Sequence, residues 1–127
     1  MFIKSCIPFF YIHQPLEILS NGEYSVYSDI FAFGVLIWEI ASRSSKPFEG
    51  LEWFEIGTEI KRNNRPTIPN DCPIEIKNLI ERCWNQDPKQ RPPIEQIIEY
   101  LENVQLQQTE NEGTQYAGNS FSSKYFL

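Results

Sequence analysis

The strongest constraint on this chain is an apolar run in its first third. Nine consecutive residues, Ile30 to Trp38, carry no charge, and most of them are large and apolar. A surface helix shows one apolar stripe, whereas a helix that is apolar on all sides belongs inside a core. The run is too short to span a bilayer, which needs ~20 apolar residues. The sequence therefore predicts a buried central helix from Ser28 to about Ala41, capped by Ser25 or Ser28.

Three further helices are expected to pack around the central one. The segment from Leu51 to Arg62 is a helix of weak periodicity, and Pro66 follows its end. Pro73 suits a helix start, because its missing N–H costs nothing there. Apolar residues recur at helical spacing in two later segments: Ile76, Leu79, Ile80, Cys83 and Trp84, then Ile94, Ile97, Ile98, Leu101 and Val104. No segment alternates as a strand does, so the predicted fold class is all-α.

Composition excludes several classes of protein. The length of 127 residues suits one small domain, and the net charge of −6 argues against nucleic acid, which needs a basic surface. Three cysteines without a Cys-x-x-Cys pair, beside a single histidine, predict no zinc site and reduced thiols in a cytoplasmic protein. Because Pro8 interrupts the N-terminal apolar stretch, neither a signal peptide nor membrane contact is expected.

The chain divides into three expected parts. Residues 1–20 are interrupted by Pro8 and Pro15 and predict irregular structure. Residues 21–104 hold the helices. Residues 105–127 are rich in Gln, Asn, Glu, Ser and Thr and lack apolar periodicity, which predicts a disordered polar tail.

The order of these signals resembles the C-terminal part of the C-lobe of a eukaryotic protein kinase, of the tyrosine-kinase-like type. Residues 28–34, Ser-Asp-Ile-Phe-Ala-Phe-Gly, resemble the start of the central helix of that lobe. Residues 83–92, Cys-Trp-Asn-Gln-Asp-Pro-Lys-Gln-Arg-Pro, resemble the Cys-Trp…Asp-Pro…Arg-Pro signature. Pro15-Leu16-Glu17 resembles the Ala-Pro-Glu motif that closes the activation segment, with only Glu17 matching. The resemblance implies a partial C-lobe: the central helix with about three packed helices, without the N-lobe and the catalytic loop.

The resemblance also assigns roles to six positions: Glu17, Asp29, Phe31, Gly34, Trp84 and Arg91. It implies a buried ion pair between Glu17 and Arg91, and hydrogen bonds from the catalytic-loop backbone to Asp29. On the residues alone, Glu17 and Arg91 are also compatible with two unrelated surface charges. Asp29 is also compatible with a carboxylate that is stabilised by the helix N-terminus. Trp84 is expected in the core, and His13 is expected at the surface or in a turn rather than as a catalytic base.

Motifs for phosphoryl transfer are absent from this sequence. A kinase needs a Gly-rich loop, a lysine on its third strand, a catalytic-loop Asp and Asn, and a second Asp for Mg²⁺. We therefore expect no catalytic, cofactor-binding or metal-binding residue here, although the resemblance implies ATP and Mg²⁺ for the parent family. Whether the chain belongs to an enzyme stays open at this stage, as does specificity for Ser/Thr or Tyr.

Three functions compete on this reading. The first is a catalytically inactive kinase-family fragment or pseudokinase of signalling. The second is a non-catalytic module that binds a protein through the exposed surface of the central helix or segment 51–62. The third is a piece of an active kinase. For the chain by itself we expect an exposed apolar patch beside Asp29, because the elements that cover this surface in a whole kinase are not encoded in it.

Overall fold

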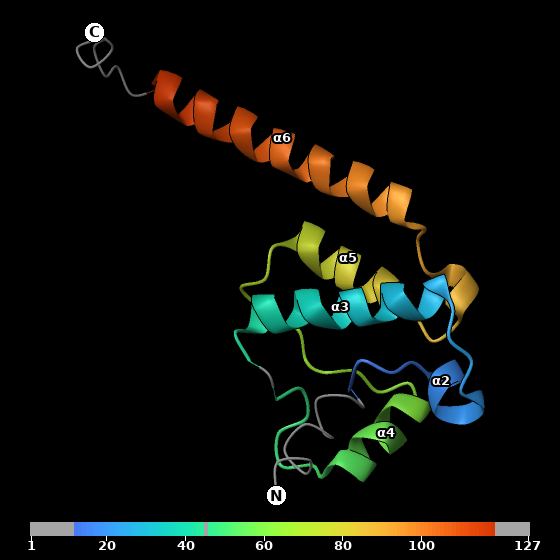
Figure 1. Cartoon of the computed structure of the whole chain (residues 1–127). Helices are drawn as coiled ribbons and strands as arrows, with labels where there is room; N and C mark the ends of the chain where they lie inside the picture. The colour runs from blue at the N-terminus through green and yellow to red at the C-terminus, as the bar shows by residue number, and fades with distance from the viewer. Residues whose placement is uncertain (1–11, 45, 119–127) are drawn as a thin grey trace, which may run out of the picture. The chain divides into compact units, whose positions relative to one another are not determined.

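The computed structural model describes residues 12–44 and 46–118, and this part of the chain contains helices and loops but no strand (Figure 1). The predicted all-α fold is therefore confirmed for the described residues. The chain divides into two compact units, residues 1–94 and residues 95–127. The first unit contains residues 15–17, 28–34 and 83–92, which carry the resemblance described above, and it is described first.

Helix α3 (Val26–Ser42) is the longest element of the first unit. Its N-terminus is a reciprocal cap: the Ser25 side chain accepts from the backbone of Tyr27, and the Ser25 backbone N–H donates to Ser28 Oγ over 2.9 Å. The indole Nε1 of Trp38 donates to the carbonyl of Thr67 over 2.9 Å and fixes the segment that precedes α5. The predicted helix is thus correct, and Ser25 is its N-cap residue.

One expectation for this helix was wrong. Its apolar residues do not all lie in the core, because Leu36 and Ile40 are 47% and 70% exposed. The buried face consists of Ser28, Ile30, Phe31, Gly34, Val35 and Trp38. The reason is coverage, since helices of the first unit pack on one side of α3 and leave the other side without a neighbour among its described residues.

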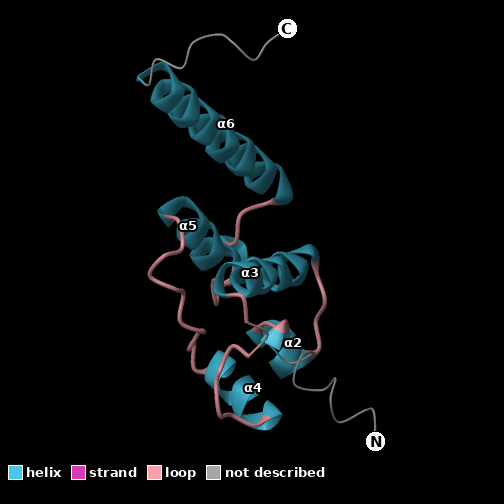
Figure 2. Cartoon of the chain, turned by 90° about the vertical axis from the view of Figure 1, so that its left-hand side faces the viewer, coloured by secondary structure: helices cyan, strands magenta, loops and turns pink. Residues whose placement is uncertain are grey.

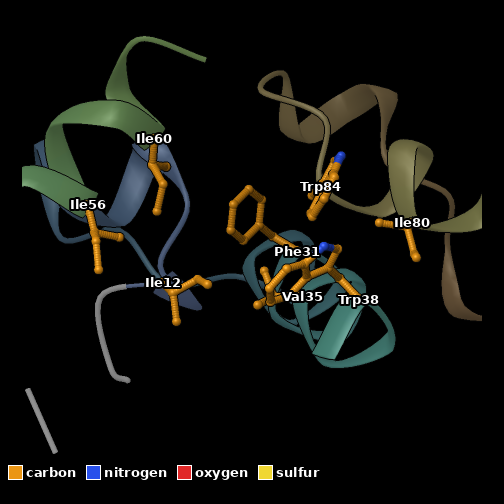
Figure 3. Close-up of a cluster of buried hydrophobic side chains, with 8 residues drawn as sticks. All are labelled: Ile12, Phe31, Val35, Trp38, Ile56, Ile60, Ile80 and Trp84. Carbon is orange, nitrogen blue, oxygen red and sulfur yellow. The ribbon is translucent and has the colours of Figure 1, made fainter. Parts of the chain in front are cut away.

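Three short elements follow α3 in the first unit. They are α4 (Trp53–Lys61), α5 (Ile74–Cys83) and the 3₁₀ helix η1 (Pro88–Gln90). Helices α3 and α5 lie side by side in both views (Figures 1 and 2). The core joins these elements with the N-terminal segment, and Figure 3 shows the ring of Phe31 reaching from α3 towards Ile60 and Trp84. Its members are Ile12, Phe31, Val35, Trp38, Ile56, Ile60, Ile80 and Trp84.

Residues 12–21 are more regular than the sequence predicted. Leu16–Asn21 forms helix α2, which follows Pro15 and ends at Gly22 with φ of 69°. Proline is tolerated at the start of a helix, and glycine takes the left-handed conformation that ends one, so Pro15 and Gly22 are the boundaries of α2. The part of the expected irregular segment at residues 1–11 lies outside the described residues.

The second unit contains most of helix α6 (Ile94–Gly118). The sequence placed the end of this helix at Val104, whereas the structure continues it to Gly118. Gln, Leu and Glu favour a helix even without an apolar stripe, and no Pro or Gly occurs between Val104 and Gly113. Disorder of residues 105–127 as a whole stays a prediction.

Candidate functional site

Glu17 and Arg91 form the ion pair that the sequence predicted. Arg91 Nη1 lies 2.5 Å from Glu17 Oε1, and Nη2 lies 3.1 Å from Oε2, so the pair is bidentate. The Arg91 side chain is fully buried, and that of Glu17 is 15% exposed. Two planar N–H pairs facing two carboxylate oxygens fix orientation as well as distance. Glu17 is placed by the first turn of α2, and Arg91 directly follows η1.

Arg91 also satisfies two backbone carbonyls. Its Nε donates to Asn85 over 2.8 Å, and Nη1 donates to Tyr27 over 2.8 Å. A buried charge is tolerated only when it is paired and its remaining protons are bonded. Arg91 therefore ties together α2, the start of α3 and the turn after α5.

Gly34 lets α3 and α5 approach closely. A Cβ atom at this position would lie only 2.7 Å from Cys83 Cβ and 3.3 Å from the backbone nitrogen of Trp84. Cys83 is fully buried in this contact, and burial raises the pKa of its thiol from 9.0 to about 11. Trp84, 5% exposed, is part of the core as the sequence predicted.

Asp29 lies on the exposed side of α3, at the rim of a pocket of about 240 Å³. The amide oxygen of Gln14 is buried beside this pocket and accepts no hydrogen bond from the described residues. The lining residues are His13, Gln14, Ile18, Tyr24, Ser28, Asp29 and Ala32. With a carboxylate and a free amide oxygen, the pocket is suited to a group that donates hydrogen bonds.

His13 is half-buried, with Nε2 3.5 Å from Glu39 Oε1 on α3. This contact joins the segment before α2 to the last turn of α3. The Glu39 Oε1 atom accepts no hydrogen bond from the described residues.

The exposed side of α3 carries an apolar stripe around Asp29. Val26 and Leu36 are 61% and 47% exposed, and both share the face of Asp29 because they lie three and seven residues from it along the helix. Ile40 continues the same stripe one turn further.

Sequence reasoning assigned no role to Arg65, yet its guanidinium group makes four hydrogen bonds. Nε donates to Trp84 O over 3.0 Å, Nη2 to Gln86 Oε1 over 2.6 Å, and Nη1 to the carbonyls of Asn64 and Ile60. Gln86 in turn donates to the carbonyls of Ile60 and Lys61. A weak signal for this role was present in the sequence, because Arg65 stands just before Pro66 and shortly after the end of a helix. A positive side chain is favourable there, since the last carbonyl groups of a helix lack partners within the helix.

The described residues contain no group of three His, Cys, Asp or Glu side chains arranged to hold a metal ion. None of the helices in residues 12–44 and 46–118 has the length and apolar character that crossing a membrane requires.

Comparison with known proteins agrees with this arrangement. The protein tyrosine and serine/threonine kinase family matches residues 4–101. The tyrosine-protein kinase receptor TYRO3 of Rattus norvegicus is 42% identical over 89 residues, which cover 70% of this chain and 10% of the receptor. A probable LIM domain-containing serine/threonine-protein kinase of Dictyostelium discoideum is 36% identical over 88 residues, covering 69% of this chain and 9% of the relative.

The tyrosine-protein kinase transforming protein ros of UR2 avian sarcoma virus is 38% identical over 88 residues, which are 69% of this chain and 22% of that protein. The chain thus spans less than a quarter of the length of each of these three relatives. The family match covers well over half of the chain, including Glu17, Asp29, Gly34 and Arg91. The chain belongs to the protein tyrosine and serine/threonine kinase family, as a part of the kinase domain with tyrosine-kinase-like character.

Proposed function

We propose that this chain is the part of a kinase domain that anchors the end of the activation segment, and that it transfers no phosphoryl group by itself. The observation that carries the proposal is the bidentate pair between Glu17 and Arg91, with Arg91 fully buried. Glu17 occupies the position that closes the activation segment in the family. The pair fixes this position to α3 and to the turn before η1.

The second half of the proposal rests on chemistry that this sequence does not encode. Phosphoryl transfer depends on groups that position ATP, bind Mg²⁺ and orient the acceptor hydroxyl. Catalysis of this kind consists of positioning and charge stabilisation, so a chain without these groups supplies neither. ATP and Mg²⁺ are therefore not expected to bind to residues 1–127 alone.

Calorimetry of the purified chain with MgATP tests this half directly. We expect no saturable heat at micromolar to millimolar nucleotide, and no transfer of labelled phosphate to a mixed Ser, Thr and Tyr peptide library. Saturable binding with a stoichiometry near one, or transfer that survives repurification, would overturn the proposal.

A second candidate function is a non-catalytic module that binds a protein. The apolar stripe of Val26, Leu36 and Ile40 on α3 favours it, as does the neighbouring pocket with Asp29 and the unbonded oxygen of Gln14. The net charge of −6 favours a protein partner over nucleic acid. The other candidate surface is segment 51–62, where Phe54 is 58% exposed.

Size-exclusion chromatography and thermal melting of residues 1–127 distinguish the two candidates. If the chain is only a part of a kinase domain, other parts of that domain normally cover the apolar stripe. The isolated chain should then aggregate or melt without cooperativity, because large exposed apolar patches are rare on soluble monomers. A monodisperse monomer with a cooperative, high-temperature transition favours the binding module instead.

A third candidate is a piece of an active kinase, favoured by the small share of each relative that the chain covers. The coding sequence upstream of Met1 tests it. An open frame that encodes the His-Arg-Asp and Asp-Phe-Gly motifs supports an active parent, and stop codons in all frames exclude one.

A further inference from the structure

Two arginines share one aromatic ring in the core of the first unit. The Cζ atoms of Arg65 and Arg91 each lie 5.1 Å from the centroid of the Phe31 ring. Phe31 is only 1% exposed, so water does not weaken these contacts. A guanidinium within about 6 Å of a ring centroid is attracted by the ring face, most strongly when both are desolvated.

The two arginines hold different parts of the unit. Arg91 binds Glu17 at the start of α2 and the carbonyl of Tyr27 at the start of α3. Arg65 binds the carbonyl of Ile60 near the end of α4 and that of Trp84 at the end of α5. Because helix C-termini leave carbonyls unbonded and partly negative, Arg65 stabilises two helix ends at once.

The cluster contains two positive charges, on Arg65 and Arg91, but only one negative charge, on Glu17. Glu17 neutralises Arg91, while Arg65 has no ion pair among the described residues. Burial and the nearby positive charge of Arg91 lower the pKa of Arg65 to about 10, so that Arg65 remains charged at neutral pH. Loss of the Glu17 charge would leave the buried cation of Arg91 and the half-buried cation of Arg65 around one ring, and their repulsion would rise.

We propose that Arg65, Phe31 and Arg91 form a coupling device that transmits the state of the Glu17–Arg91 pair to the C-terminal end of α4. When the pair is intact, Arg91 is neutralised and both guanidinium groups keep their place over Phe31. When the pair is weakened, Arg91 repels Arg65 and loosens its bonds to Ile60 and Asn64. The device thus links the start of α2 with the C-terminal end of α4, and it uses the same Glu17–Arg91 pair as the function proposed above.

Nuclear magnetic resonance of the ¹⁵N-labelled full chain tests this coupling. Glu17→Gln keeps the size of the side chain and removes its charge. We expect the Arg65 Nε–H resonance to shift, and the amides of Asn63 and Asn64 at the end of α4 to exchange at least about twofold faster with solvent. Glu23→Gln is the matched control, because it removes an exposed carboxylate six positions from Glu17 along the chain and should change neither signal.

Arg65→Gln separates this route from the direct packing of α2 on α4. Glutamine removes the second positive charge near the ring but keeps a side chain that can donate hydrogen bonds. In this background Glu17→Gln should add no further change at residues 62–64. If Arg65→Gln does not fold, Arg65→Met takes its place, since methionine also removes the charge and keeps an unbranched apolar stem.

Three results would overturn the proposal. They are unchanged exchange of the Asn63 and Asn64 amides in Glu17→Gln, an equal effect of Glu17→Gln with and without the positive charge at position 65, and a uniform rise in exchange over the whole first unit.

Discussion

Gly34→Ala is the sharpest test of the packing between α3 and α5. In an isolated helix this change is favourable, because alanine is preferred over glycine by about 1 kcal/mol in a helix interior. In the folded chain the new Cβ would meet Cys83 Cβ at 2.7 Å. The structure therefore predicts that the sign of the effect is reversed.

The magnitude follows from the contact distance. Carbon atoms pack best at about 3.5–4.0 Å, so the two helices would have to separate by about 1 Å. Cys83 Cβ is bonded directly to the backbone and has no rotamer that moves it away. Overpacking costs about 1–3 kcal/mol, and we expect the upper part of this range, about 2–3 kcal/mol, because the backbone holds both Cβ atoms in place. Subtracting the gain of about 1 kcal/mol in helix propensity leaves a net loss of about 1–2 kcal/mol in the free energy of unfolding.

A double-mutant cycle at Cys83 identifies the atom responsible. Cys83→Gly removes the Cβ atom that opposes Gly34, whereas Cys83→Ala keeps it. Gly34→Ala combined with Cys83→Gly should be more stable than the sum of the single changes by about 1 kcal/mol, and the combination with Cys83→Ala should be additive.

Urea unfolding of the full-length variants, followed by tryptophan fluorescence and circular dichroism, measures these free energies. The m-value should stay constant if only the native contact changes. A Gly34→Ala chain that is more stable than the parent would refute the reasoning, as would equal coupling with glycine and alanine at position 83.

Two further predictions concern single groups. Arg43 ends α3 in the left-handed conformation with φ of 54°, so Arg43→Gly should raise the free energy of unfolding by about 0.5–1 kcal/mol in urea titrations. The same change at Arg62, where φ is −80°, should lower it, and a gain at both sites would contradict the backbone argument. Because burial raises the pKa of Cys83 from 9.0 to about 11, the folded chain keeps a proton between these values that the unfolded chain has released. The contribution of Cys83 is thus fully present below about pH 9 and falls by up to about 2 kcal/mol towards pH 11, measured as the difference from Cys83→Ala across this range. A pH-independent difference would show that the thiol is not desolvated.

The sequence by itself determined where the central helix and the three helices after it begin, but not helix α2. The helices were readable because their apolar residues recur with the period of the α-helix, which is a local property of the chain. The ion pair was inferred from the resemblance to the kinase family rather than from the residues, since 74 positions separate its partners.

Only the tertiary structure decided which side of α3 is buried. The run from Ile30 to Trp38 is apolar on every side, so its periodicity contains no information about which residues meet a neighbour. Gly34 shows the physical reason, because α5 can approach α3 most closely where no Cβ intervenes, and that approach leaves Leu36 and Ile40 exposed.

The role of Arg65 was likewise invisible in the sequence. Its hydrogen bonds run to carbonyls of Ile60 and Trp84, and backbone groups are the same at every position of a sequence. The ring of Phe31 brings Arg65 into one cluster with Arg91, although neither spacing nor charge predicts that contact. Local periodicity thus determined where the helices form, and only packing decided which faces and charges meet, because these contacts depend on positions distant in the chain.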